Sequence, residues 1–429
     1  MDQSIEAQRS QRRLKRNVRC VLGLGFFQVF LVIMPVIVPF FQSRGLTMSD
    51  VLLLQAVFAA VVLVMEVPSG YIADVLGRRR SLVTGALFIA LGHGCLLFAS
   101  GFAELALFEA LLGIGTSLVS GADLAILYDT EQALAGNSEH PEKVVGRLFS
   151  LHTAGEATAS LVCSLVLTWL PMDVVVYVQV LAGSMPLLLA LALHEPPGEK
   201  LHRHSHLENV REIVSHLFGN GAVLRYTFAA LCVWSLTTFY AVWFLQQNWH
   251  DKGVELSNFG YLWGTMMLVS AFAGRYAHRA ERRLGAAGLL TLVGIAPVVG
   301  YLGLAYFGLV GGMLASLTFF VSRGLGLVVL RDAFNRRLPG KFRATANSLA
   351  SLGFRLAYVV TAPLAGVVLD GWGFQATMVL LAAGTVAVFA FLIVPLIVAV
   401  REQQSRPWEG SSCAISRAAE GSPEPDLRS

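Results

Sequence analysis

The sequence is poor in charge, because only 14% of its 429 residues are Asp, Glu, Lys or Arg, whereas soluble globular proteins carry about 25%. It also lacks the local patterns of several enzyme classes, since no HExxH, GxSxG or GxxxxGK[ST] occurs. The five cysteines are odd in number and widely spaced, so neither a disulfide framework nor a CxxC metal site is predicted. These absences argue against a secreted enzyme, an ATP-driven machine and a nucleic-acid module. We expect no cofactor and no resident metal.

Apolar residues are abundant instead: 55% of the chain is hydrophobic and the mean hydropathy is +0.63. A hydrocarbon core about 30 Å thick needs about 20 mostly apolar residues per helical span. Barrel strands are excluded because the apolar runs are continuous rather than alternating. The sequence therefore predicts an all-α integral membrane protein, a monomer in the lipid bilayer, with twelve transmembrane helices near 20–41, 48–75, 81–99, 104–129, 145–168, 173–193, 222–247, 256–276, 286–306, 309–333, 344–368 and 373–400.

The basic residues indicate the orientation of these helices. All but four of the 32 Lys and Arg residues fall in the terminal arms or in loops on one side of the predicted membrane, the exceptions being Arg44, Lys252, Arg323 and Arg355. Cytoplasmic loops carry an excess of positive charge. We therefore expect both termini in the cytoplasm of a multi-pass protein of the bacterial inner membrane.

The longest interior loop divides the chain into two sets of six helices. The predicted units are a basic N-terminal arm (1–19), an N-terminal half (20–194), a linker (195–221), a C-terminal half (222–400) and a disordered tail (401–429). His202, His204 and His206 alternate in the linker, where we favour a solvated loop over metal sensing, and an amphipathic helix follows them. Division into six and six suggests duplicated, pseudo-symmetric halves. Transporters built from two repeats bind substrate between the halves, near the bilayer midplane.

The most specific motif follows the second predicted helix and reads Gly70-Tyr-Ile-Ala-Asp74-Val-Leu-Gly77-Arg78-Arg79-Arg80. It resembles the signature loop of the major facilitator superfamily, Gly-x-Leu-Ala-Asp-x-x-Gly-Arg-Arg/Lys, and the likeness extends over the twelve helices. The resemblance implies the major facilitator fold. It also implies a cytoplasmic conformational gate in which the aspartate faces helix 11 and the arginine engages an acid at the end of helix 4. The gate residues would be Gly70, Asp74, Gly77, Arg78, Arg79 and Asp129.

That gate is expected to stabilise the outward-open state. The alternative is that the arginines serve only as topological anchors. Two family patterns are missing from the chain. Helix 4 carries Glu109 to Gly113 where many proton-coupled members have Arg-x-x-x-Gly, and helix 5 lacks the drug-antiporter pattern Gly-x-x-x-Gly-Pro-x-x-Gly-Gly. The proton relay of the family and drug export in particular therefore do not carry over.

Ionisable residues inside membranes are rare and usually functional. Glu156 and Arg355 each lie about 17 Å from the cytoplasmic end of their helices, at 1.5 Å per residue. A carboxyl group in low dielectric exchanges a proton as access alternates. We therefore name Glu156, with His152 and Glu66, as candidates for proton coupling.

Arginine cannot lose its charge at working pH, so a buried arginine needs an acidic partner or an anionic substrate. The alternative for all the buried charges is that internal ion pairs only hold helices together. Aromatic residues on helix 7 are further candidates to line a cavity, although such residues more often pack or anchor at interfaces. The predicted substrate-binding set is Arg323, Arg355, Asp123, Glu109, Trp234, Tyr240 and Trp243.

Together these features predict a secondary active transporter driven by protons or another coupling ion. Export of a small organic solute by alternating access is the first interpretation, because the helix 2 region resembles efflux members. Uptake of an anionic or zwitterionic metabolite by proton symport is the alternative, and an integral membrane enzyme is a distant one. The expected partners are the small-molecule substrate, the coupling ion and the bilayer, without nucleic acid.

Overall fold

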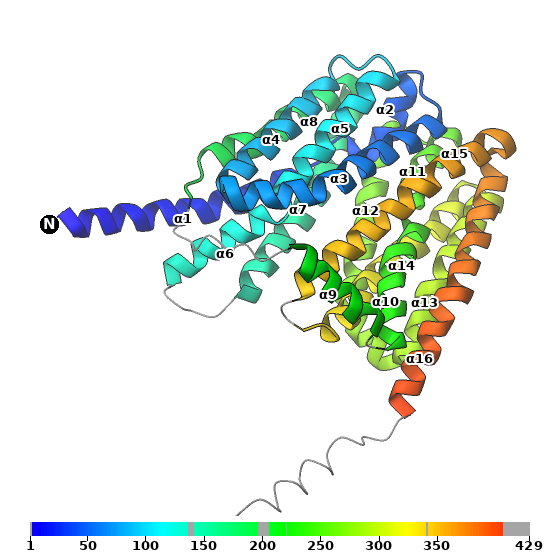
Figure 1. The fold of residues 1–429 in the computed structure, drawn as a ribbon. Coiled ribbons are helices and arrows are strands. Elements are labelled where there is room, and N and C mark those ends of the chain that lie inside the picture. The colour runs from blue at the N-terminus through cyan, green and yellow to red at the C-terminus, as the bar shows by residue number, and fades with distance from the viewer. Residues whose placement is uncertain (1, 136–140, 196–205, 220, 340–341, 406–429) are drawn as a thin grey trace, which may run out of the picture.

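The computed structural model describes residues 2–135, 141–195, 206–219, 221–339 and 342–405. These residues form helices and, within the described ranges, no strand (Figure 1). Seven helical segments are long and apolar enough to cross a membrane, and one of them, Thr345–Gln403, has 59 residues. At about 20 residues per span, that segment is long enough for two crossings. The predicted all-α membrane fold is confirmed.

The N-terminal half carries the first six apolar stretches, and the first and the fourth of them contain more than one helix. Its elements are α1 (Asp2–Gln28), η1 (Met34–Val36), α2 (Ile37–Ser43), α3 (Met48–Leu76), α4 (Arg78–Cys95), α5 (Phe102–Val119), α6 (Ala122–Ala135), α7 (Pro141–Trp169) and α8 (Met172–Leu191). Helix α9 (His206–Gly219) lies within the linker. His202 and His204 lie outside the described residues.

The C-terminal half carries the remaining six stretches. Its elements are α10 (Ala222–Val233), α11 (Leu236–Asp251), α12 (Leu256–Arg275), α13 (Ala277–Tyr306), α14 (Leu309–Arg336), α15 (Arg343–Val388), the π-helix η3 (Phe389–Ile393) and α16 (Val394–Ser405). Helix α15 turns at Gly373, whose φ of 79° favours glycine, and so contains the eleventh span and part of the twelfth. From residue 406 on, the predicted tail lies outside the described residues.

Three spans that the sequence predicts as continuous are interrupted. Residues 29–33 separate α1 from η1 in the first span, Ser120 and Gly121 separate α5 from α6 in the fourth, and Trp234 and Ser235 separate α10 from α11 in the seventh. Gly121 has a φ of +82°, a conformation that other residues rarely adopt. Hydropathy did not reveal these breaks because Val29 to Ile33 are themselves apolar, and because two residues at each of the other breaks scarcely change the mean hydropathy of a span. Irregular backbone at membrane depth is tolerated where it is buried in protein or lines a cavity.

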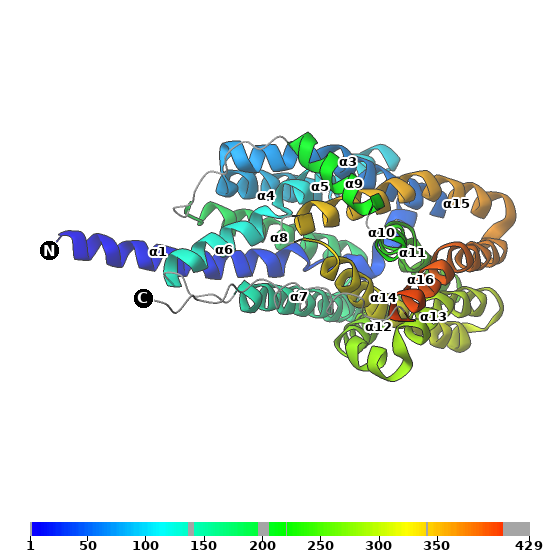
Figure 2. The same cartoon turned by 60° about the horizontal axis from the view of Figure 1, so that its bottom comes forward.

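The two halves meet at one end of the bundle. We call the end with the start of α1, the α3–α4 turn and the end of α8 the basic end. Figure 1 shows the halves converging near α2 and α11 and diverging towards α6 and α10, and Figure 2 shows α1 projecting beyond the bundle at the basic end. Hydrogen bonds between the halves cluster at the opposite end. The Ser49 hydroxyl donates to the Gly366 carbonyl at 2.9 Å, and the Ser164 hydroxyl accepts from the Tyr261 amide at 3.0 Å.

Two buried glutamine side chains form hydrogen bonds with the backbone of the broken first span. The Gln246 amide of α11 is fully buried, accepts from the Val38 amide and donates to the Met34 carbonyl, both at 3.1 Å. The Gln179 amide of α8 accepts from the Ile33 amide at 3.3 Å. Unpaired backbone groups are costly away from water, so these two glutamines replace the helical hydrogen bonds that the break removes.

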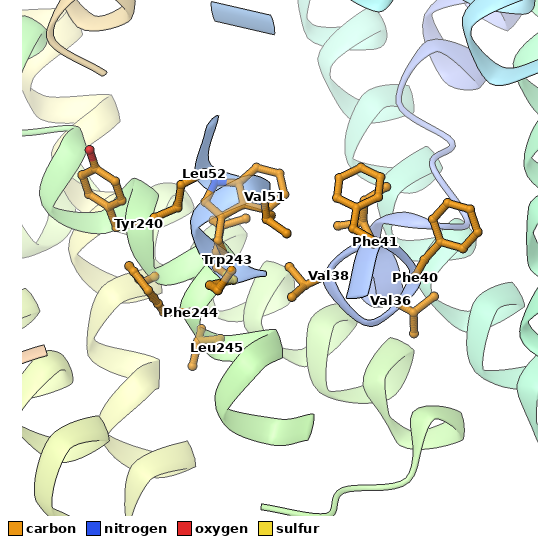
Figure 3. Packing of buried hydrophobic residues seen from close by; sticks show 14 of the residues in the cluster. Val36, Val38, Phe40, Phe41, Val51, Leu52, Tyr240, Trp243, Phe244 and Leu245 are labelled. Carbon is orange, nitrogen blue, oxygen red and sulfur yellow. The ribbon is translucent and has the colours of Figure 1, made fainter. Parts of the chain in front are cut away.

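An apolar cluster surrounds these bonds and seals the same end. Figure 3 shows that it draws side chains from both halves. The labelled members from the N-terminal half are Val36, Val38, Phe40, Phe41, Val51 and Leu52, and those from α11 are Tyr240, Trp243, Phe244 and Leu245. All ten are less than 6% exposed. The described state is therefore closed at the end opposite the basic end.

Glycines allow neighbouring helices to approach closely, as is usual in membrane bundles. A Cβ on Gly85 of α4 would lie 2.8 Å from the Gly115 carbonyl oxygen of α5 and 3.0 Å from the Leu118 Cβ. Backbone atoms cannot give way as a flexible side chain can. By contrast, a Cβ on Gly94 of the same helix would meet no atom within 4 Å.

We expect Gly85→Ala to lower the free energy of unfolding by about 1–3 kcal/mol, because overpacking forces the two helices apart. Gly94→Ala should leave it unchanged or raise it by up to about 1 kcal/mol through helix propensity. Thermal unfolding of the purified variants in one detergent measures both. Equal melting temperatures for the two variants would contradict close packing at Gly85.

Candidate functional site

A cavity of about 520 Å³ lies within the C-terminal half, between α10, α11, α14 and α15. Its apolar side is aromatic, with Trp234, Phe239 and Phe354, and its polar side carries hydroxyls, amides and two guanidinium groups. The Asn347 side chain donates to that of Asn335 at 2.7 Å, near the basic ends of α15 and α14. The cavity therefore runs from the break in the seventh span towards the basic end, where the halves diverge.

One face of α14 supplies the positive charge of the cavity. Arg323, Leu327, Arg331 and Asn335 all line it and follow one another at intervals of four residues, which places them on one helix face. Arg323 was predicted from the sequence, whereas Arg331 and Asn335 were missed. Their four-residue spacing from Arg323 is the signal that would have found them.

Two pairs of oppositely charged side chains connect the halves, and in each pair an acid of the N-terminal half faces an arginine of the C-terminal half. Glu156 of α7 interacts electrostatically with Arg323 of α14. Glu66 of α3 interacts in the same way with Arg355 of α15, whose guanidinium also lies 5.9 Å from the centre of the Phe58 ring. Neither pair is among the ion pairs shorter than 4.0 Å between described residues. Both acids thus lie near an arginine of the other half without a fixed bridge to it.

The two arginines differ in their surroundings. Arg323 lines the cavity, and Arg355 is not among the lining residues although Ser351, one turn before it, is. The Nε atom of Arg355 is buried without a hydrogen-bond partner among the described residues. Of these two arginines, Arg323 therefore lies at the cavity surface, and Arg355 lies near Glu66.

The remaining predicted acids lie in the N-terminal half. Asp123, in the first turn of α6, is buried, accepts from the Leu124 amide at 2.7 Å and interacts electrostatically with His152 of α7. The Nε2 atom of His152 is buried without a partner among the described residues. Glu109 is 4% exposed and accepts from the Gln55 side chain at 2.6 Å. Neither Asp123 nor Glu109 lines the cavity described above.

The predicted aromatic residues are divided between two environments. Trp234 lines the cavity and packs so closely on α14 that a Cβ on Gly326 would overlap its ring. Tyr240 and Trp243 belong to the sealing cluster and are each 4% exposed. The Tyr240 hydroxyl is hydrogen-bonded to that of Thr361 at 2.7 Å.

The predicted gate lies at the basic end of the N-terminal half. Arg78 forms an ion pair with Asp129 of α6 and donates to the Ala125 carbonyl at 3.0 Å. Gly77 has a φ of +95° in the turn between α3 and α4. The side chain of Asp74 lies outside the described part of the structure. Gly70 is exposed, and a Cβ on it would meet no atom within 4 Å.

A carboxylate that the sequence analysis missed caps the start of α4. Glu195 accepts from the backbone amides of Arg78 and Arg79 at 3.0 and 2.9 Å, and Arg79 donates through Nε to the Leu193 carbonyl at 2.6 Å. Helix N-termini favour negative charge. No local sequence motif predicts this contact, because Glu195 lies 117 residues from Arg78.

The end of α8 is also tied to α1. Asn17 donates to the His194 carbonyl at 2.6 Å and accepts from the His194 amide at 2.9 Å, while Arg16 donates to the Ala192 carbonyl at 2.6 Å. Burial lowers the pKa of His194, and the positive charge of Arg16 lowers it further. The basic end of this half is thus a connected unit of α1, α4, α6 and α8.

Comparison with known proteins identifies the architecture. The model of the Major Facilitator Superfamily matches residues 20–336. The structure resembles the nucleoside transporter NupG with a TM-score of 0.73 and 13% identity, over 89% of this chain and 98% of that one. It also resembles a bacterial homologue of the human lysosomal transporter Spinster, solved inward-facing and unoccupied, with a TM-score of 0.69 and 15% identity over 91% and 97% of the two chains.

Two curated relatives are more similar in sequence. An uncharacterised MFS-type transporter of Salmonella typhimurium is 25% identical over 368 residues, which are 81% of this chain and 88% of the relative. A probable 4-methylmuconolactone transporter of Cupriavidus pinatubonensis is 28% identical over 167 residues, which are 38% and 36% of the two chains. The family match covers well over half of the chain, and so the chain belongs to the Major Facilitator Superfamily of secondary transporters.

Proposed function

We propose that this chain moves a small organic anion across the membrane in exchange for, or together with, protons. The observation that carries the proposal is the pair of guanidinium groups, Arg323 and Arg331, on the α14 face of the cavity. Arginine is well suited to bind carboxylate and phosphate, because its planar fork donates two parallel hydrogen bonds. A cationic solute would instead be repelled by both groups.

The rest of the cavity suits a small solute with an apolar body. Trp234, Phe239 and Phe354 offer flat apolar surfaces, and Ser351 and Asn347 offer hydrogen bonds. A volume of about 520 Å³ is within the usual range for small-molecule sites. One relative is named as a probable transporter of 4-methylmuconolactone, a small organic compound, which supports a solute of this size.

Glu156 is the group we assign to proton coupling. It is accessible and faces Arg323 from the other half of the protein. An anion bound at Arg323 competes with Glu156 for the same positive charge, so its binding favours protonation of the carboxylate. This competition links the solute and the proton at a single arginine, and His152 and Glu66 remain secondary candidates.

We assign the gate at the basic end to Arg78 and Asp129, with Asp74, Gly70, Gly77 and Arg79 as its other members. The ion pair joins α4 to α6 within one half. It thereby presents a rigid surface against which the C-terminal half closes when the opposite end opens. We place the basic end in the cytoplasm, in agreement with the distribution of Lys and Arg.

Export and uptake remain the two predicted directions of net flux. The positive charge of the cavity favours an anionic or zwitterionic solute, and this supports uptake. The resemblance of the α3 region to efflux members supports export. Flux measured in both directions in oriented vesicles distinguishes the two.

We expect an imposed pH gradient to drive flux of a small carboxylate in proteoliposomes, and Glu156→Gln to abolish the dependence on the gradient. The amide keeps the shape of the side chain but cannot take up a proton. Radiolabel uptake and internal pH are recorded together. Glu131→Gln is the matched control, because Glu131 pairs with Arg147 at 3.9 Å, outside the cavity lining. Proton movement that persists in the Glu156 variant would remove this residue from the mechanism.

We expect the two half-buried arginines, Arg323 and Arg355, to behave differently. Arg323→Gln should weaken binding of carboxylates about ten- to a hundredfold relative to their neutral amides, through loss of charge-assisted hydrogen bonds worth about 1.5–3 kcal/mol. Arg355→Gln should instead lower stability, because it leaves the half-buried Glu66 without its positive neighbour, and Glu66→Gln in the same chain should restore it. Equilibrium binding and melting temperature are measured for each variant. The assignment is wrong if Arg323→Gln affects acids and amides equally.

We expect Asp129→Asn to slow flux about fivefold while leaving the yield of folded protein unchanged. The Arg78 and Asp129 side chains are each 25% exposed. An ion pair that is partly exposed in this way is worth about 1 kcal/mol, enough to shift a conformational equilibrium but not to unfold a helix bundle. Initial rates are compared at matched protein density with Glu131→Gln, a second acid of α6, as the control. Wild-type rates in the Asp129 variant would show that the arginines act only as topological anchors.

A further inference from the structure

A second hollow lies on the outer surface of the C-terminal half, away from the cavity. It has a volume of about 340 Å³ and is formed by α10, α11, α13 and α15. Its rim includes Leu364 and Leu380, which are 60% and 45% exposed. In a membrane-spanning bundle such exposed leucines face the lipid tails. The hollow, which we call the lateral pocket, therefore opens to the bilayer and not to water.

The lateral pocket and the cavity share no lining residue, although both use the seventh span. Trp234, Ser235, Thr238 and Phe239 face the cavity, whereas Val233, Leu236, Thr237 and Tyr240 face the lateral pocket. The two sites therefore lie on opposite faces of α10 and α11. A ligand of the lateral pocket would not compete directly with a solute at Arg323.

A tyrosine with an unsatisfied hydroxyl lines the pocket. Tyr301 of α13 is 1% exposed, and its hydroxyl has no hydrogen-bond partner among the described residues. Its ring is fixed edge-on against Phe319, with centroids 4.6 Å apart. A buried hydroxyl without a partner is costly. The position therefore calls for a polar atom that the protein itself does not supply.

Tyr240 provides the complementary group. Thr361 donates its hydroxyl proton to the Ala357 carbonyl at 2.7 Å, so Tyr240 is the donor in its 2.7 Å bond to Thr361. The Tyr240 oxygen keeps free lone pairs, and its hydroxyl lies near enough to that of Tyr301 to interact electrostatically. In Figure 3 the Tyr240 hydroxyl points away from Phe244. The pocket thus offers a donor at Tyr301 and an acceptor at Tyr240, close together.

We propose that the lateral pocket binds an apolar molecule with a single hydroxyl group, of the alkylphenol or long-chain alcohol class, which enters from the lipid phase. The hydroxyl accepts from Tyr301 and donates to Tyr240, and the apolar body lies against Leu364, Leu380 and the open backbone at Gly384. A hydroxyl satisfies both tyrosines at once because it is both donor and acceptor. A lipid acyl chain fills the same volume but leaves Tyr301 unpaired.

The test uses two photoreactive probes in proteoliposomes, a diazirine-bearing 4-hexylphenol and the same molecule without the hydroxyl. Labelled peptides are mapped by mass spectrometry, with unlabelled 4-hexylphenol as competitor. We expect the phenol probe to label residues 361–388 of α15. Tyr301→Phe should reduce that labelling about five- to tenfold, the effect of one hydrogen bond, and should leave labelling by the hydroxyl-free probe unchanged. Tyr306→Phe is the matched control, since Tyr306 is exposed on the same helix and does not line the pocket.

Gly384→Phe tests the location independently of the hydroxyl. A Cβ on Gly384 would meet no atom within 4 Å, so the larger side chain is accommodated by filling the pocket, and both probes should lose their label. Labelling that persists in Gly384→Phe would place the probes elsewhere and overturn the site. Equal loss of both probes in Tyr301→Phe would overturn the preference for a hydroxyl and leave a site for lipid chains. Because the readout is labelling and not flux, failure here is separate from failure of the proposed transport function.

Discussion

A membrane interior offers no water to pair with polar groups, so a backbone amide or carbonyl exposed by a break in a helix is costly unless another part of the protein bonds to it. The broken first span illustrates the consequence. Its freed backbone groups at Ile33, Met34 and Val38 are bonded by the side chains of Gln179 and Gln246. Because Gln246 belongs to the other half, the same bonds that satisfy the break also hold the two halves together at one end.

The same constraint applies to the charged residues of the predicted spans. Glu156 and Glu66 each face an arginine of the opposite half without forming a close ion pair. A short, well-bonded bridge would resist separation of its partners. In a looser pair, a bound solute or a proton can change the attraction between the acid and the arginine. The arrangement suits a protein whose halves move relative to each other, whereas a purely structural bundle would favour tighter pairing.

Sequence reasoning succeeded where a signal is local or periodic. Long apolar runs and the absence of alternation predicted the all-α membrane fold, and the motif from Gly70 to Arg80 indicated the family. It could not predict Glu195 at the start of α4, since that contact joins residues more than a hundred positions apart. It also predicted one continuous helix near 104–129, which contains both Glu109 and Asp123. The break at Gly121 changes their relation, and hydropathy is insensitive to a single residue with positive φ. The roles assigned to the site residues remain predictions.

The interruption at Trp234 and Ser235 has a thermodynamic consequence. Helices α10 and α11 each present residues to the cavity on one side and to the lateral pocket on the other. A change in the angle between these two helices therefore reshapes both surfaces together. If an occupant of one surface prefers one angle, it changes affinity at the other, and linkage requires the reverse effect to have the same size. The seventh span would then couple the composition of the lipid phase to the affinity for a solute from the aqueous phase.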